Sequence, residues 1–138
     1  MPVDCLLRIV GTVRSPLVSL ANCPKQGLEG APEAWIEIRP EYAAAMDGLR
    51  KGDQVIVLTW LHEASRDRLT THPRGNPDAP ERGVFSTRSP NRPNPIGLHR
   101  VKVMEMDPSG RLRVQPLEVL DGTPVLDIKP LIRGEMEG

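Results

Sequence analysis

The stretch LHRVKVMEMDPSGRLRVQPLEVL, residues 98–120, decides the fold class of this chain. Its two halves, residues 98–106 and 112–120, have the valine-rich, apolar composition of β-strands. The tetrad Asp107-Pro108-Ser109-Gly110 between them is typical of a tight turn. The stretch therefore predicts two strands joined by a turn.

Three further stretches predict strands upstream of it. Residues 6–13 (LLRIVGTV) are β-branched and apolar and run into Arg14-Ser15-Pro16, which indicates a strand that ends in a turn. Residues 34–39 (AWIEIR) alternate isoleucines with an aromatic and an acidic side chain, as a half-buried strand does. Residues 54–61 (QVIVLTWL) are nearly all apolar and predict a central strand buried on both faces.

The remaining segments predict one helix and long loops. Residues 41–49 (EYAAAMDGL) contain good helix formers, whereas residues 17–33 are rich in Pro, Gly and Asn and predict a loop. Residues 62–95 predict a long irregular stretch that holds six of the 15 prolines of the chain. So many prolines argue against a helical bundle, because a proline inside a helix breaks it.

Together these segments predict one mainly all-β domain over residues 1–138. The domain is expected to be a small barrel or a sandwich, with one short helix and long loops rich in proline and arginine. The acidic tail, from about residue 133 to 138, is expected to be frayed.

The composition excludes several classes of function. The 18 basic and 18 acidic residues give zero net charge, which argues against binding to nucleic acid or an anionic membrane through bulk charge alone. Cys5 and Cys23 are too few for a disulfide scaffold or a four-cysteine zinc site and are expected to be free thiols. No signal-peptide pattern, membrane-length apolar run, Rossmann glycine motif or P-loop occurs, so a cytoplasmic protein is the default expectation.

Zero net charge hides an uneven distribution. Between Arg66 and Lys102, eight basic residues face three acidic ones, so this segment carries +5 and the rest of the neutral chain carries −5. Almost all of these bases are arginine, whose planar guanidinium suits bidentate contact with phosphate or carboxylate. An ordinary solvated loop with scattered charge is the alternative interpretation.

The segment GVFSTRSPNRPNPIGL, residues 83–98, is the most distinctive part of the basic stretch. Arg88 and Arg92 lie four residues apart among Ser, Thr and Asn residues, and prolines and Gly97 fix the backbone around them. Prolines hold polar groups in place at a lower ordering cost, so the loop could form a preorganised polar site. A rigid connector whose arginines cap carbonyl groups fits the same residues equally well.

A second cluster is DGTPVLDIKP, residues 121–130, which opens with a strong turn signal. Asp127 and Lys129 are two residues apart on an extended segment, so both side chains point to the same face. A carboxylate beside an ammonium group can orient, or exchange protons with, a substrate nitrogen. A surface ion pair is the alternative interpretation.

The histidines do not predict a metal site. His62 and Glu63 follow the predicted strand 54–61 directly, which suits either a binding site or a structural histidine. His62, His72 and His99 lack the spacing of metal ligands, so no zinc site is expected.

Both clusters resemble the signature of the TsaA/TrmO-like (YaeB-type) family. Supporting features are GTVRSP at residues 11–16, Pro24-Lys25-Gln26 and the strand-ending His62, and the resemblance covers about residues 6–132. It implies a small β-barrel methyltransferase that uses S-adenosylmethionine without a Rossmann motif. The best-known members methylate the exocyclic nitrogen of threonylcarbamoyl-adenosine in tRNA, and members form homodimers with the cofactor close to the subunit interface.

The resemblance also implies which residues form the site. The residues expected along the cofactor are Pro24, Lys25, Gln26, His62, Glu63, Arg88, Leu98, Leu117 and Glu118. The candidates for the acceptor side are Arg92, Asn94, Asp127 and Lys129, with Asp127 as the first choice for a base. The chain departs from the family pattern at His99, where serine is frequent, and at Glu118, where aspartate is frequent.

Three functions compete at this point. The first is an S-adenosylmethionine-dependent methyltransferase whose acceptor is tRNA. The second is a module that binds S-adenosylmethionine or a related nucleotide without turnover. The third is a nucleic-acid-binding barrel whose arginine loop contacts phosphates without a cofactor.

Overall fold

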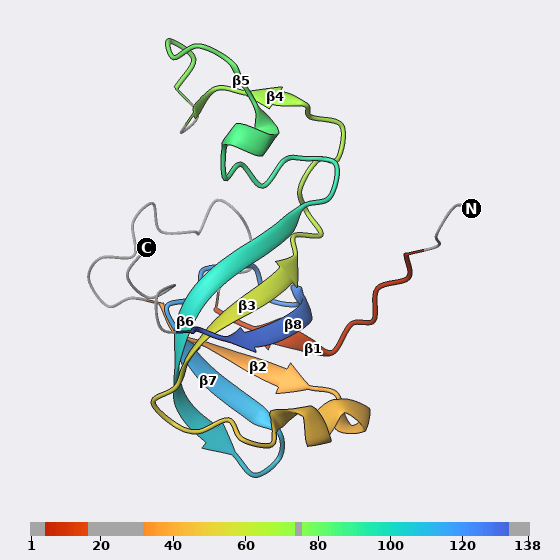
Figure 1. The fold of residues 1–138 in the computed structure, drawn as a ribbon, viewed down its shortest axis with the longest axis vertical. Helices are drawn as coiled ribbons and strands as arrows, with labels where there is room; N and C mark the ends of the chain where they lie inside the picture. The colour runs from red at the N-terminus through yellow and green to blue at the C-terminus, as the bar shows by residue number, and fades with distance from the viewer. Residues whose placement is uncertain (1–4, 17–31, 74–75, 133–138) are drawn as a thin grey trace.

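The computed structural model describes residues 5–16, 32–73 and 76–132, and these residues fold mainly into β-strands (Figure 1). Six of the strands close into a barrel in the order β1-β2-β7-β6-β3-β8, with every neighbouring pair antiparallel. They are β1 (Gly11–Arg14), β2 (Ala34–Ile38), β3 (Gln54–Trp60), β6 (Ile96–Asp107), β7 (Arg111–Gln115) and β8 (Pro124–Pro130). The prediction of a mainly all-β fold is confirmed, and the architecture is the barrel rather than the sandwich.

Alternate residues of the barrel strands fill its interior. Val13 of β1 pairs with Ile36 of β2, which pairs in turn with Leu112 of β7, and all three are at most 1% exposed. Val103 of β6 and Val114 of β7 form another pair that is fully buried. Burying each such side chain contributes roughly 1.5–3 kcal/mol, so the β-branched and leucine positions of the strands supply the core.

The strand predicted at residues 54–61 is β3, but only one of its faces is fully buried. Val55, Val57 and Thr59 point into the barrel and are at most 1% exposed. Ile56 and Leu58, between them, are only partly buried because they lie on the outer face. The expectation of burial on both faces is therefore wrong, since the outer face of β3 stays partly exposed.

Two predicted strands are shorter in the structure. The strand expected at residues 6–13 begins at Gly11. The backbone N–H of Val10 still donates to the Val125 carbonyl of β8, whereas Leu6 is 90% exposed. The strand expected at residues 112–120 ends at Gln115, before Pro116, which has no backbone N–H to donate. Leu117 is nevertheless buried against the core, at 1% exposed.

The predicted turn and helix are both present. Asp107 and Ser109 form the turn between β6 and β7, and Gly110 completes it with a φ of 94°, a conformation that favours glycine. The helix expected at residues 41–49 is a 3₁₀ helix, η2, over Pro40–Met46. It lies at the end of the barrel opposite to the one where β3 stops and β6 starts (Figure 1). No helix of the described residues is long and apolar enough to cross a membrane.

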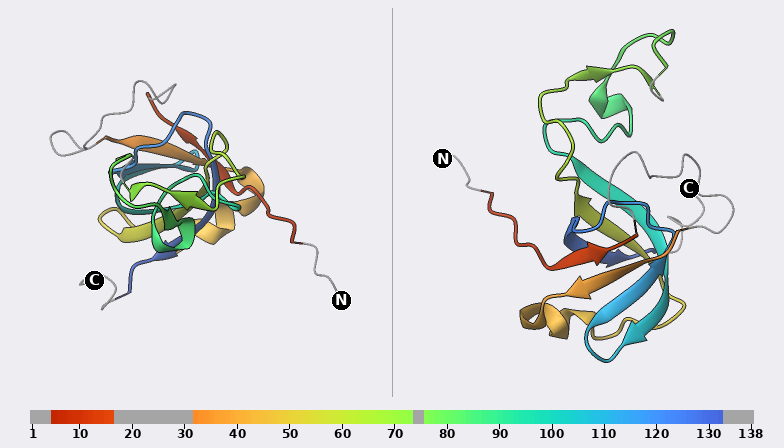
Figure 2. Two further views of the ribbon diagram at one scale, coloured as in Figure 1. Left: turned by 90° about the horizontal axis from the view of Figure 1, so that it is seen from above. Right: turned by 180° about the vertical axis from the view of Figure 1, so that it is seen from behind.

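The long stretch between β3 and β6, residues 62–95, is called the excursion from here on. It stands beyond the end of the barrel where β3 stops and β6 starts (Figures 1 and 2). It is mostly irregular, as predicted, but it also contains a small two-stranded sheet of β4 (Thr70–Thr71) and β5 (Arg82–Gly83) and a 3₁₀ turn, η4 (Val84–Ser86). The expected loop and tail fall largely on residues 17–31 and 133–138, outside the described residues.

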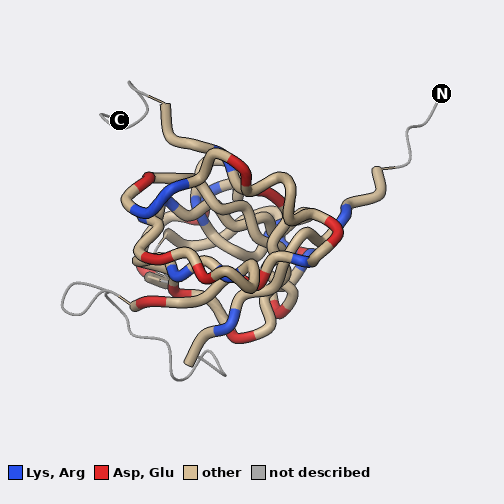
Figure 3. Tube along the Cα trace, turned by 90° about the horizontal axis from the view of Figure 1, so that it is seen from below, with Lys and Arg blue, Asp and Glu red and all other residues tan. Residues whose placement is uncertain are grey.

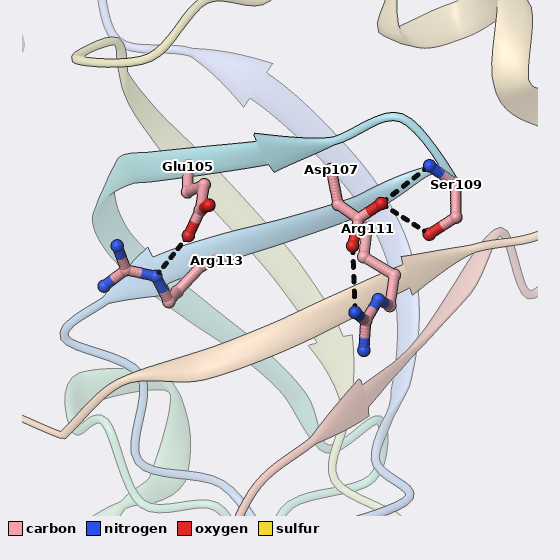
Figure 4. A network of polar contacts seen from close by, with 5 residues as sticks. All are labelled: Glu105, Asp107, Ser109, Arg111 and Arg113. Carbon is pink, nitrogen blue, oxygen red and sulfur yellow. Dashed lines mark hydrogen bonds and ion pairs between the residues drawn. The ribbon is translucent and has the colours of Figure 1, made fainter.

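Ion pairs on the outside of the barrel hold the β6–β7 hairpin (Figure 4). The Asp107 carboxylate accepts hydrogen bonds from the backbone N–H and the hydroxyl of Ser109, both at 2.8 Å, and pairs with Arg111 at 2.9 Å. The Ser109 backbone N–H, with Arg111 and the hydroxyl, lowers the pKa of Asp107 to about 2. Arg113 pairs with Glu105 at 3.1 Å. Basic and acidic residues are accordingly interspersed over the barrel (Figure 3).

Candidate functional site

A cavity of about 270 Å³ lies at the end of the barrel beneath the excursion, and is called the barrel-end cavity. Its polar lining residues are His62, Glu63, Asn91, His99, Glu118 and Thr123, and Leu61, Val119 and Leu120 are among the apolar ones. Three of the residues expected along the cofactor thus meet in one place, although 56 positions of sequence separate the first from the last of them, His62 and Glu118.

The chain reaches this cavity from two sides, and hydrogen bonds join them. Leaving β3, the backbone N–H of Leu61 donates to the carbonyl of Pro95 at 2.8 Å. The N–H of Ser65 donates to Asn91 Oδ1 at 2.9 Å, and the N–H of Arg92 donates to the Ser65 carbonyl at 3.0 Å. The segment that follows β3 and the segment that precedes β6 therefore form one cross-linked wall.

His99 forms the inner wall of the cavity. Its Nε2 lies 2.9 Å from the hydroxyl of Thr59, a residue that is fully buried inside the barrel. Burial lowers the pKa of His99 to about 4, so the imidazole is neutral at physiological pH. Gly97 makes room for this pair, because a Cβ there would lie 2.5 Å from Thr59 Oγ1 and 2.7 Å from His99 Nε2.

Arg92 caps carbonyl groups within its own loop. Its guanidinium donates to the carbonyl oxygens of Val84, Thr87 and Ser89. The contacts of Arg92 fit the interpretation of this loop as a rigid connector whose arginines cap carbonyl groups, rather than its interpretation as a preorganised site. By holding residues 84–89 in a closed turn, it fixes the shape of the loop beside the cavity.

Asn94 is likewise held from within the excursion. Its Oδ1 accepts a hydrogen bond from Arg66 Nη2 at 3.1 Å, while Arg66 Nε donates to the Pro93 carbonyl at 2.8 Å. The Arg66 guanidinium also lies over the Trp60 ring, 5.1 Å from its centroid, which ties the excursion to the end of β3.

Arg88 lines a different cavity, of about 580 Å³, between the β4–β5 sheet and residues 86–91. This is called the arginine cavity, because Arg82 lines it as well. Pro90 and Asn91 belong to both cavities, so the two lie side by side.

Asp127 and Lys129 lie outside the barrel-end cavity. Their side chains form an ion pair of 3.1 Å and are about half exposed, at 48% and 60%. Asp127 lines a cavity of about 390 Å³ beside η2, with Tyr42 and Met46. Within one chain, the structure therefore does not bring Asp127 to the residues that line the barrel-end cavity.

The register of the sheet nevertheless places Asp127 in line with Leu98. Leu98 of β6 pairs with Leu58 of β3, which pairs with Asp127 of β8. Directly paired residues share a face, so the three form one row on the outside of the barrel, with Leu98 and Asp127 roughly 10 Å apart. Leu98 is 43% exposed in this row.

The other predicted site residues are placed differently. Leu117 lies in the core, where its backbone N–H donates to the Pro32 carbonyl at 3.0 Å. Pro24, Lys25 and Gln26 fall outside the described residues. Among the described residues, no group of three His, Cys, Asp or Glu side chains is placed to hold a metal ion.

Sequence reasoning did not assign His99 and Arg82 to a site. His99 has the same parity along β6 as Val101 and Val103, which point into the barrel, so strand alternation was a signal that it points inward. Arg82 gave no such signal, because its position depends on the pairing of Thr71 with Arg82 across the β4–β5 sheet.

The fold and these cavities define a small closed β-barrel with a ligand-sized hollow at one end. Residues 12–134 match the family described as the tRNA-methyltransferase O N-terminal domain, and the chain belongs to this family.

Relatives of the chain are similar over most of its length. A probable S-adenosyl-L-methionine-binding protein of Methanothermobacter thermautotrophicus is 48% identical over 124 residues, which cover 90% of this chain and 88% of the relative. An S-adenosyl-L-methionine-binding protein of Archaeoglobus fulgidus is 44% identical, with 90% and 87% covered. The crystal structure of TrmO from Pseudomonas aeruginosa superposes with a TM-score of 0.72 at 32% identity and covers 94% of this chain. The chain spans only 57% of that TrmO chain.

Proposed function

We propose that this protein is an S-adenosylmethionine-dependent methyltransferase that acts on tRNA. The barrel-end cavity carries the proposal, because it gathers His62, Glu63 and Glu118 in a family of tRNA methyltransferase domains. Relatives named as S-adenosylmethionine-binding proteins support the choice of cofactor. The cofactor would supply an electrophilic methyl group on its positively charged sulfur.

The chemistry of the cavity fits such a cation. Two carboxylates, Glu63 and Glu118, favour a positively charged ligand, and His99 adds no repulsion because it is neutral. Leu61, Val119 and Leu120 offer apolar walls for an adenine ring. Arg88, in the neighbouring arginine cavity, would hold the carboxylate of the methionine part.

A homodimer is part of the proposal, and the outer face of the barrel supports it. Ile96 pairs with Trp60, and Leu98 with Leu58, so apolar side chains run along the outside of β3 and β6. Ile96 and Leu98 are each 43% exposed. A second copy seated on this face would bury the row that also contains Asp127, and would bring Asp127 to the subunit interface. The dimer would act in the cytoplasm.

Asp127 is proposed as the base for the acceptor, the exocyclic nitrogen of threonylcarbamoyl-adenosine. Its carboxylate would accept the proton that the nitrogen loses when the N–C bond to the methyl group replaces the bond between that methyl group and the cofactor's sulfur. Lys129, 3.1 Å away, would orient this carboxylate. Arg92 and Asn94 would act as positioning residues, since both are engaged in holding the loop of the excursion.

Calorimetry with S-adenosylmethionine and transfer of labelled methyl groups into tRNA test the proposal. Glu118→Gln is expected to weaken cofactor affinity at least tenfold, since a hydrogen bond to a charged group contributes roughly 1.5–3 kcal/mol. Glu41→Gln, an equal charge change on exposed η2, is the matched control and should change nothing. Methyl transfer should require tRNA that carries threonylcarbamoyl-adenosine.

Other outcomes would select the competing functions. Cofactor binding without transfer to any tRNA would identify a binding module and refute the enzyme. Binding of tRNA with no heat on addition of S-adenosylmethionine would identify a cofactor-free nucleic-acid-binding barrel.

A further inference from the structure

The arginine cavity has capacity for more than one anionic group. The β4–β5 sheet and residues 86–91 enclose about 580 Å³, and no acidic residue lines that space. Its principal polar lining residues are Thr71, His72, Arg82, Ser86, Arg88 and Ser89. Asp67, Asp78 and Glu81, the acidic residues of the excursion nearest to it in sequence, are not among those that line it.

The two guanidinium groups of this cavity are not neutralised. Within the described part of the chain, neither guanidinium group makes an ion pair or a hydrogen bond, and both residues are exposed. The arginines of the barrel differ, because Arg14 pairs with Glu37 and Arg111 with Asp107. The charge of Arg82 and Arg88 is therefore available to a ligand.

A hydroxyl group beside them is oriented as a donor. The Ser86 hydroxyl donates a hydrogen bond to the Gly83 carbonyl, and the Thr87 hydroxyl donates one to the Val84 carbonyl. Ser89 Oγ instead accepts the backbone N–H of Asn91 at 3.3 Å, which leaves its own proton free for a ligand in the cavity. Planar guanidinium groups and a hydroxyl donor are the groups that bind a phosphate oxygen.

A single cofactor carboxylate would occupy only one of the two arginines. Pro90 lines both the arginine cavity and the barrel-end cavity, and Arg88 lies two residues from it. Arg82 lies on β5, eight residues from Pro90, and is therefore farther in sequence from the place where the two cavities meet. We propose that Arg82, with Ser89, forms a phosphate subsite that takes a phosphodiester of the RNA acceptor beside the cofactor. The assignment to RNA rests on the proposed function.

Equilibrium binding of tRNA to the full chain, measured by fluorescence anisotropy at several salt concentrations, tests the subsite. Arg82→Gln is expected to weaken tRNA binding about tenfold and to lower the slope of log K against log salt by about 1, as the loss of one phosphate contact does. The matched control is Arg68→Gln, an exposed arginine of the same excursion that lines none of the three cavities described above. It should weaken binding less than twofold. Both variants should bind S-adenosylmethionine like the wild type by calorimetry.

Several results would overturn the inference. Equal losses of tRNA affinity in the Arg82 and Arg68 variants would mean that Arg82 acts only through the overall charge of the excursion, and would refute the subsite. The proposed methyl transfer would not be affected, because it is measured on the wild type. Loss of cofactor affinity in Arg82→Gln would assign Arg82 to the cofactor instead. No tRNA binding by the wild type would remove both the subsite and the proposed RNA acceptor. If the wild type binds tRNA through Arg82 but transfers no methyl group, the inference stands and the proposed enzyme falls.

Discussion

The buried histidine of the barrel-end cavity predicts how the stability of this protein depends on pH. In the unfolded chain His99 takes up a proton as the pH falls through its ordinary value of 6.5, whereas in the folded barrel it stays neutral until about 4. The unfolded state thus binds more protons between these values, so the free energy of unfolding falls as the pH is lowered from about 6.5 to about 4. Below about 4 this loss is complete.

The size of the effect follows from the two pKa values. The difference between 6.5 and about 4, at about 1.4 kcal/mol for each pKa unit, amounts to about 3 kcal/mol. This is a large share of the 5–15 kcal/mol that typically separates folded from unfolded states. The physical cause is desolvation of the imidazole, which is packed beside Thr59 and Gly97 in the barrel end.

Urea unfolding between pH 7.5 and 4, followed by circular dichroism, measures this loss. His99→Gln keeps a neutral polar group for Thr59 and removes the titration, so its free energy of unfolding should decline by about 3 kcal/mol less than that of the wild type. The other titrating groups are the same in both proteins and cancel in the comparison. Parallel stability curves for the two proteins would refute the reasoning.

Four further outcomes are expected. Gly97→Ala should lower the free energy of unfolding by about 1–3 kcal/mol in urea, because its Cβ would lie 2.5 Å from Thr59 Oγ1; Gly83→Ala, whose nearest neighbour would be 4.0 Å away, should change it little. Arg92→Lys should speed amide hydrogen exchange over residues 84–91, because a lysine ammonium lacks the planar set of donors with which the guanidinium binds three carbonyl groups at once. Unchanged exchange would contradict the role of Arg92 in holding the loop closed. Asp127→Asn should reduce methyl transfer at least a hundredfold and leave cofactor affinity within twofold; unchanged turnover would remove Asp127 from the mechanism. Wild type should lose stability in acid as the pH falls from 3.8 to about 2 while Asp107 is protonated, and Asp107→Asn should lose less over that range.

The strands and turns were predictable because their signals are local. The alternation in residues 34–39 and the turn composition at residues 107–110 both correspond to elements of the structure. The errors occurred where a strand needs a partner. Residues 6–9 have the composition of a strand but precede Val10, which is hydrogen-bonded to β8, and residues 117–120 follow a proline that interrupts β7.

The site could be predicted only in part, for a similar reason. His62, Glu63 and Glu118, which the family resemblance implies along the cofactor, line one cavity, and their role there stays a prediction. The same motif that contains Arg88 also contains Arg92, and local sequence does not distinguish an arginine that faces a cavity from one that caps its own loop. That distinction depends on where the neighbouring carbonyl groups lie once the loop has closed.

The sequence by itself determined the all-β class, the hairpin around the turn at residues 107–110 and the family, because alternation, turn residues and motifs act over a few neighbouring positions. The tertiary structure alone decided how those residues meet. The pairing of β3 with β6 and β8 brings Thr59 to His99, which is 40 positions away. It also turns Asp127 to the outer face in line with Leu98, away from the barrel-end cavity. Strand register and barrel closure are long-range properties, and they determine which polar groups share a cavity.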